Sequence, residues 1–159
     1  AANEDHVGMG LRHASRDRAD THLRHQLDAD TGPWIAVFQI MNQLGQILAP
    51  LRAEGILIIG SGSFTHDLAS FRSSGGRIDA PELDWVHAFA EWMASALRDR
   101  RVDDLLNYRV LAPEAAHNHP TEEHLLPLYV ALGAGADVVK HLHQSTTYGI
   151  LRMDAFAFS

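Results

Sequence analysis

Residues 54–68 read EGILIIGSGSFTHDL, and this stretch decides how the rest of the chain is interpreted. Its apolar run, Ile56 to Ile59, is short, rich in β-branched residues and followed by glycines, which is typical of a buried central strand. A Gly-Ser-Gly-Ser turn comes next and leads to His66. Open α/β sheets place their chemistry at the carboxyl ends of strands. His66 is therefore the first candidate site residue.

A second histidine stands in an equally distinctive context, HNHPTEEHLLPLYVALGAG at residues 117–135. The pattern predicts a helix capped by Thr121, with two glutamates near its positive dipole end. His124 would lie in the first turn of this helix, where the dipole favours the neutral imidazole that can bind a metal. His119 and Glu123 add to a cluster that is rich in ligand atoms. The question is whether His66 and His124 share one site.

The remaining sequence predicts alternating strands and helices. We expect strands over residues 34–41 and 148–159, helices over 42–52, 81–101 and 103–108, a loop over 112–119 and a polar crossing over 140–147. The alternation predicts an α/β fold with a central mixed, mostly parallel sheet flanked by helices. Residues 1–26 are polar and rich in histidine, which favours an N-terminal arm that is frayed or dependent on a partner, with a single domain over residues 27–159.

Composition excludes several classes of function. The chain has 159 residues, 46% of them apolar, with a net charge of -7, which argues against binding of nucleic acid. It has no cysteine, so disulfides, thiolate metal sites and cysteine nucleophiles are excluded, and its eleven histidines are the expected ligands for a transition metal. The longest apolar stretch is interrupted and too short to cross a membrane. No signal peptide is visible in residues 1–10, so we expect a cytoplasmic protein.

The glycine-rich turn before His66 has competing interpretations. It lacks the Lys-Ser/Thr ending of a phosphate-binding P-loop, and a glycine occupies the serine position of a Gly-x-Ser-x-Gly nucleophile elbow. A tight turn that carries a surface histidine is the plain structural alternative. Spacing alone does not separate that alternative from a functional site.

Several segments together resemble a known family. ILIIGSGSFTHDL, the helix at residues 85–97, LLNYRVLAPEAAHNHPTEEHLLPLYVALGAG and the closing YGILRMDAFAF are similar, in that order, to the C-terminal half of class III extradiol ring-cleavage dioxygenases of the LigB superfamily. The DOPA-dioxygenase-like branch is the most similar. The resemblance covers residues 23–159, and GSGSFTH and HPTEEHLLPL are its specific parts.

The resemblance implies an oxidoreductase that opens a catecholic aromatic ring with dioxygen and a non-haem metal, Fe²⁺ or alternatively Zn²⁺. By position, His66 would be the acid/base histidine at the edge of the metal, and His124 would be a metal ligand. Glu123 would support His124 or compete as a ligand, and His119 would be a supporting residue.

The family also has two N-terminal histidine ligands, in Gly-His-Gly and Ser-Ala-His motifs, and neither motif occurs here. Three interpretations stay open: the histidines of residues 1–26 substitute, a partner chain supplies the ligands, or the chain is a truncated, non-catalytic metal-binding or assembly protein that keeps the core of the fold. A sheet edge left without its neighbour favours pairing, so we expect a homo-oligomer or a complementary chain.

Overall fold

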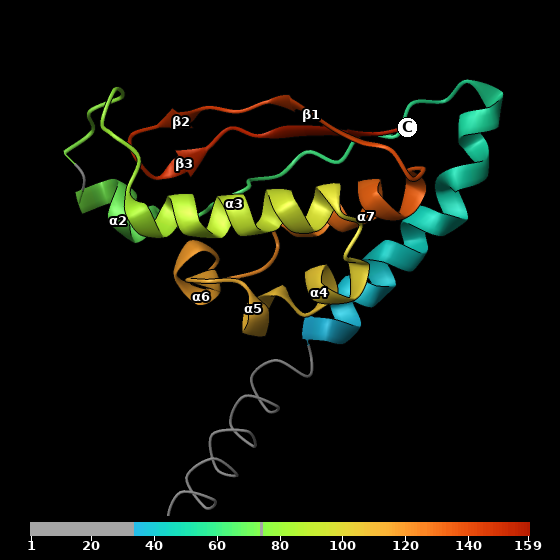
Figure 1. Ribbon diagram of the computed structural model, residues 1–159, viewed down its shortest axis with the longest axis horizontal. Helices are drawn as coiled ribbons and strands as arrows, with labels where there is room; N and C mark the ends of the chain where they lie inside the picture. The colour runs from blue at the N-terminus through green and yellow to red at the C-terminus, as the bar shows by residue number, and fades with distance from the viewer. Residues whose placement is uncertain (1–33, 74) are drawn as a thin grey trace, which may run out of the picture. The chain divides into compact units, whose positions relative to one another are not determined.

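Helix α3 (Asp84–Arg98) buries one complete face against the rest of the chain. In this computed structural model, which describes residues 34–73 and 75–159, strands lie on one side of α3 and short helices on the other (Figure 1). The helix predicted over residues 81–101 is confirmed as α3, and its buried residues include Val86, Phe89, Ala90, Met93 and Leu97. The predicted arm over residues 1–26 lies outside the described residues.

The strands form two small antiparallel ribbons. Strand β1 (Val139–His143) pairs with β4 (Ala155–Phe158), and β2 (Thr146–Thr147) pairs with β3 (Leu151–Arg152). The fold is mixed α/β as predicted, and the strands among the described residues form these two antiparallel pairs, without the central parallel sheet that the sequence predicts. The predicted polar crossing is also wrong, because β1 and β2 occupy it.

The predicted terminal strand is confirmed in two pieces, β3 and β4. Its alternation with period two is visible in the burial of the side chains: Ile150 and Arg152 are buried, whereas Met153 points to solvent. Successive side chains of a strand point to opposite faces. The alternation therefore places Arg152 on the same buried face as Ile150.

Residues 34–48 are helical, so the strand predicted over residues 34–41 is wrong. The buried positions Phe38, Asn42 and Gly45 are spaced by four and three residues, which is the period of a helix. The run is dense in β-formers, but a short apolar run does not by itself distinguish a strand from a helix. A 3₁₀ helix, η1 (Ala49–Glu54), follows and is capped by Gly55.

The apolar run Ile56 to Ile59 is not a strand. Residues 56–63 are extended without a sheet partner among the described residues, and Leu57 and Ile59 are 79% and 76% exposed. The prediction of a buried central strand is therefore wrong for the described chain. A strand needs a neighbour to satisfy its backbone, and the described residues provide none.

The other helices are short: α2 (Leu68–Ser73), α4 (Val102–Leu106), α5 (Tyr108–Leu111), α6 (Ala115–Asn118) and α7 (Leu126–Ala134). Helix α6 lies in the predicted loop over 112–119. Helix α7 begins at Leu126 rather than after Thr121, so His124 lies in the turn before the helix and not within its first turn. Helix α7 ends at Ala134, and Gly135 follows the last helical residue.

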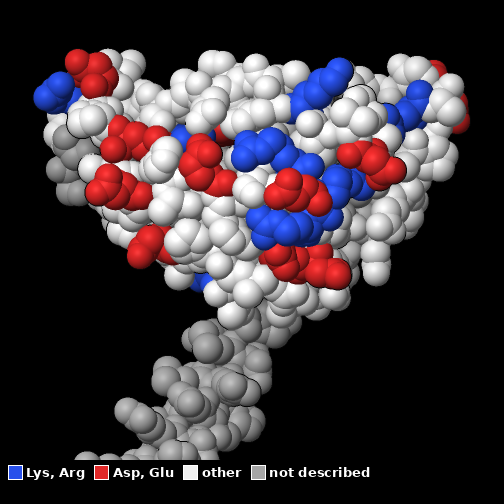
Figure 2. Space-filling model, in the orientation of Figure 1, with Lys and Arg blue, Asp and Glu red and all other residues white. Residues whose placement is uncertain are grey.

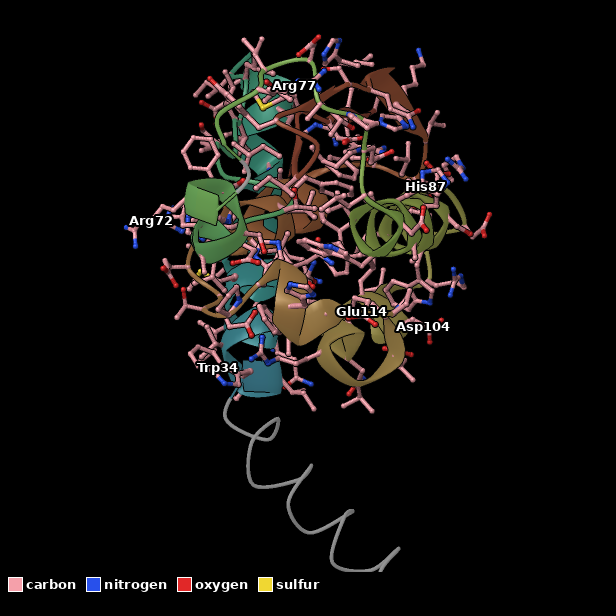
Figure 3. The ribbon with its side chains drawn as sticks, turned by 90° about the vertical axis from the view of Figure 1, so that its left-hand side faces the viewer. Trp34, Arg72, Arg77, His87, Asp104 and Glu114 are labelled. Atoms are coloured by element: carbon pink, nitrogen blue, oxygen red, sulfur yellow. The ribbon has the colours of Figure 1, made fainter. Side chains whose placement is uncertain are left out.

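The core is aromatic where the helices meet. Phe38 stacks on Tyr129 with ring centroids 4.6 Å apart and meets the edge of Tyr108 at 5.3 Å. Acidic and basic side chains are intermixed on the face in Figure 2, and Arg72 of α2 points outward in Figure 3. No described helix is long and apolar enough to span a membrane.

Candidate functional site

His66 and His124 lie in direct contact. Their imidazole rings stack with centroids 3.7 Å apart and planes inclined by 15°. His66 follows the extended segment, and His124 belongs to the turn before α7. The two residues that the sequence singled out are therefore brought to one point, although the elements that carry them differ from those predicted.

Backbone hydrogen bonds join the two segments that carry these rings. The Ser63 amide donates to the His124 carbonyl at 2.8 Å, and the His66 amide donates to the Asn118 carbonyl at 2.7 Å. A Cβ atom on Gly62 would lie 2.2 Å from the His124 carbonyl oxygen, so only glycine permits this approach. The glycine-rich turn thus has a packing role, which neither the phosphate-binding nor the serine-nucleophile interpretation would require.

His119 supports the site from behind. Its side chain is fully buried, and Nε2 lies 3.0 Å from the Phe64 carbonyl oxygen. Because a carbonyl only accepts, Nε2 carries the proton, and Nδ1 is left buried without a hydrogen-bond partner in the described chain. Burial, the largest cause, and the charges of the nearby His66 and Arg109 together lower the pKa of His119 to about 4. His119 is therefore neutral near pH 7, and its contact with Phe64 holds it against the segment that leads to His66.

The two adjacent glutamates have opposite environments. Glu123 is exposed, accepts a hydrogen bond from the Thr121 hydroxyl at 2.8 Å and lies 3.4 Å from His124 Nδ1. A hydrogen bond from its own backbone amide and the one from Thr121 lower the pKa of Glu123. Its place beside His124 fits the supporting role that the resemblance implies.

Glu122, in contrast, is fully buried, and sequence reasoning missed its role. It forms an ion pair with Arg109 and accepts a hydrogen bond from the Tyr108 hydroxyl. Arg109 also donates to the His119 carbonyl at 2.6 Å, which ties this network to the site. Burial raises the pKa of Glu122 despite these partners. The sequence does not show which of two consecutive acidic residues is buried.

A second group lies directly after His66. Asp67 is buried and accepts hydrogen bonds from the amides of Ala69 and Ser70, which caps α2. His117 Nε2 lies 3.2 Å from Asp67 Oδ2, and the His117 ring stacks on Trp85 with centroids 3.8 Å apart. The order Asp then apolar helix was a readable cap signal. These contacts hold the backbone directly after His66 in place.

The described site offers fewer ligands than a metal centre needs. His66 and His124 offer two imidazoles with Glu123 beside them, and burial followed by the charge of His124 lowers the pKa of His66. Within residues 34–73 and 75–159, no three His, Asp or Glu side chains are grouped so that they could hold a metal ion. The pair suits a transition metal in ligand type but not in ligand number.

His119 should make the free energy of unfolding decrease as the pH falls below 7. Its folded pKa of about 4 lies below the value of 6.5 for a histidine in an unfolded chain, so acid protonates the unfolded chain first. The loss begins near pH 6.5 and approaches about 3 kcal/mol as the pH falls through 4. Urea unfolding at pH 7 and 4.5 measures it. In His119→Gln this part of the pH dependence should disappear, and an unchanged difference between the two pH values would contradict the assignment.

Comparisons with known proteins place the chain in a family. The family described as the catalytic LigB subunit of aromatic ring-opening dioxygenase matches residues 35–155. A 4,5-DOPA dioxygenase extradiol of Beta vulgaris is 38% identical over 119 residues, which cover 74% of this chain and 43% of that protein. One of Portulaca grandiflora is 35% identical over 124 residues, or 73% of this chain and 42% of that protein.

The fold has a relative of known structure. The crystal structure of an uncharacterized protein from Escherichia coli K12 superposes with a TM-score of 0.60 at 25% identity, and the match covers 75% of this chain and 49% of that chain. The chain thus spans less than half the length of the relatives it matches. The match over residues 35–155 and the identity to the DOPA dioxygenases show that the chain belongs to the LigB superfamily of ring-opening dioxygenases, in its DOPA-dioxygenase-like branch.

Proposed function

We propose that this chain carries the C-terminal part of the catalytic site of an extradiol dioxygenase that opens a catecholic ring. The observation that carries the proposal is the contact between the imidazoles of His66 and His124, which come from segments separated by 58 positions. The relatives' printed name makes DOPA the first catecholic compound to test. We propose a catecholic compound as the substrate of this chain and the cytoplasm as its location.

In this proposal His124 holds the metal, Fe²⁺ or alternatively Zn²⁺, and His66 stands at its edge. A ferrous ion held there would supply open coordination positions for the two diol oxygens and for dioxygen. The part of His66 is to accept a proton from the diol and return it to the opened product, which a neutral imidazole can do. Burial and the charge of His124 lower the pKa of His66, which favours the neutral form of the His66 ring. Glu123 orients His124 through Nδ1.

A second candidate is a non-catalytic metal-binding or assembly protein. The observation that favours it is the absence of a third ligand beside the two histidines within the described residues. Both candidates predict a weak metal site at His124, and they differ in whether a catechol is cleaved. The same purified chain can test both.

His124→Ala should weaken binding of Zn²⁺ or Fe²⁺ by at least ~10-fold, because it removes one of two imidazole donors. Isothermal titration of the purified chain measures the binding. With ferrous iron and DOPA under air, the wild-type chain should form a yellow ring-opened product. His66→Ala should slow that reaction by ~10²-fold or more while it retains part of the metal affinity, because it removes the proton acceptor.

His143→Ala is the matched control. Its imidazole bonds Ser145 at an exposed position of β1, and its replacement should change neither metal affinity nor product formation. Metal binding through His124 without a yellow product would favour the assembly protein. Binding that is indifferent to His124→Ala would remove both candidates.

A further inference from the structure

Thr65 is the residue directly before His66, and it is fully buried although its side chain carries a hydroxyl. The hydroxyl donates a hydrogen bond to the Ile150 carbonyl at 2.7 Å and accepts one from the Arg152 amide at 2.9 Å. Buried hydroxyls are stable where both kinds of hydrogen bond are satisfied. Thr65 meets this condition through the backbone of a segment that lies 85 and 87 positions later in the sequence.

The two partners of Thr65 belong to the start and the end of β3. Ile150 directly precedes this strand, and Arg152 is its last residue. A carbonyl and the amide two positions after it are the two groups that one residue of a parallel neighbouring strand would bond. Among the described strands, β3 pairs with β2 alone. The Thr65 hydroxyl therefore takes the place of a strand neighbour for two backbone groups of buried residues.

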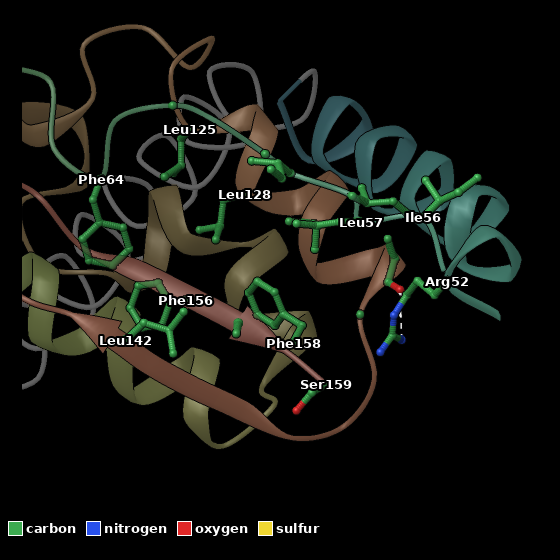
Figure 4. Close-up of a pocket in the computed structure, with 18 of the residues that line it drawn as sticks. Arg52, Ile56, Leu57, Phe64, Leu125, Leu128, Leu142, Phe156, Phe158 and Ser159 are labelled. Carbon is green, nitrogen blue, oxygen red and sulfur yellow. Dashed lines mark hydrogen bonds between the residues drawn. The ribbon is translucent and has the colours of Figure 1, made fainter. Parts of the chain in front are cut away.

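The backbone before Thr65 is fixed by other partners. The Phe64 ring packs on the Phe156 ring of β4 with centroids 5.4 Å apart (Figure 4). The Ser63 hydroxyl donates to the Thr65 carbonyl at 2.5 Å. None of these contacts involves β3. The side chain of Thr65 is thus the link between this backbone and β3, one residue before His66.

The position of the His66 ring depends on this backbone. The ring meets His124 in a stack with centroids 3.7 Å apart. Contact between stacked atoms weakens steeply with distance, and a gap of about 0.5–1 Å already loses a quarter to a half of the attraction. A small displacement of the backbone at Thr65 is therefore enough to separate the two imidazoles.

We propose that Thr65 is a positioning residue of this site. The two hydrogen bonds of its hydroxyl to β3 hold the backbone where the His66 imidazole reaches His124. Thr65 acts through His66 and supplies neither a ligand nor a proton to the reaction. The use of that position for proton transfer rests on the proposed function, whereas the position itself can be measured without metal or substrate.

Thr65→Val tests the role of the hydroxyl, because valine has nearly the same shape and cannot form either bond. The full chain is studied without metal, at one fixed pH, by NMR. In the wild type, the ring current of His124 shifts the Hε1 signal of His66, and His124→Ala gives the position of that signal without the stack. In Thr65→Val the signal should move more than half of the way to this position. Hydrogen exchange of the Arg152 amide should be ~10-fold faster or more.

Two further variants separate positioning from a general loss of structure. Thr65→Ser keeps the hydroxyl, so both the His66 signal and the Arg152 exchange should stay close to those of the wild type. Thr147→Val is the matched control in the same ribbon, since the Thr147 hydroxyl bonds the Ile78 carbonyl at 3.4 Å. It should leave the His66 signal unchanged.

Three results would overturn the proposal: an unchanged His66 signal in folded Thr65→Val, a signal in Thr65→Ser displaced as far as in Thr65→Val, or a wild-type signal equal to that of His124→Ala. Circular dichroism checks folding. Should Thr65→Val not fold, Thr65→Ser decides: an unchanged His66 signal supports the proposal, and a displaced one overturns it. Loss of metal binding or of the yellow product alters none of these readings, so failure of the proposed function is distinguishable.

Discussion

Replacing Arg152 by methionine is expected to lower the free energy of unfolding by about 3–5 kcal/mol, which is the usual cost of removing one partner from a buried ion pair. The Arg152 side chain is 1% exposed and binds Asp154 through two parallel contacts, 2.7 Å from Nε and 3.1 Å from Nη2. It also bonds Glu82 at 2.8 Å. Methionine keeps the apolar stem but leaves the Asp154 carboxylate buried without its main cation.

Chemical denaturation at pH 7 measures this loss, and Arg77→Met is its matched control. Arg77 and Asp79 have the same spacing of two residues, but their side chains are 69% and 76% exposed. The control should change stability by less than about 0.5 kcal/mol, because exposed ion pairs contribute little. Adding Asp154→Asn to Arg152→Met should restore part of the lost stability. Equal effects of Arg152→Met and Arg77→Met would contradict the importance of burial.

Arg109→Met is expected to cost about 3–4 kcal/mol at pH 7, since it leaves the fully buried Glu122 charged without its cation. It also removes the hydrogen bond from Arg109 to the His119 carbonyl, which lies behind the site. The Tyr108 hydroxyl remains as a donor to Glu122 and limits the cost. Urea unfolding of both proteins measures the difference.

The pH dependence of this difference identifies its cause. Burial already raises the pKa of Glu122, and loss of Arg109 raises it further. Below that pKa the carboxyl is protonated and needs no cation, so the difference between variant and wild type should shrink as the pH falls from 7 to 5. Arg109→Met combined with Glu122→Gln should be more stable at pH 7 than Arg109→Met alone. The exposed Arg98→Met is the control and should have no such pH dependence.

Features that depend on local pattern could be predicted from the sequence. The period of α3 and the alternation of the terminal strand both depend on neighbouring positions, and both are confirmed. The meeting of His66 and His124 could also be predicted, because family resemblance fixes long-range proximity that spacing does not. The metal and acid/base roles of these residues remain predictions.

The errors have a shared physical origin. Ile56 to Ile59 have the composition of a buried strand, but a strand exists only where another strand pairs with it, and composition does not show whether that neighbour is present. For residues 34–41, the packing of Phe38 onto Tyr129 favours a helix over the local preference for a strand. Glu122 is buried beside Arg109, which lies 13 positions earlier in the sequence, and the residues next to Glu122 give no sign of this pairing.

Residues 57–62 have no strand partner within the part of the chain that the structure describes, and this bears on how the isolated chain behaves in concentrated solution. Natural proteins guard such edges with lysine, proline or a bulge, and these six residues, Leu-Ile-Ile-Gly-Ser-Gly, contain neither lysine nor proline. An apolar, uncharged and open edge is a template on which further copies can add strand by strand into fibrils. We therefore expect the isolated chain to aggregate at high concentration, and we expect any polypeptide that covers this edge to reduce the aggregation.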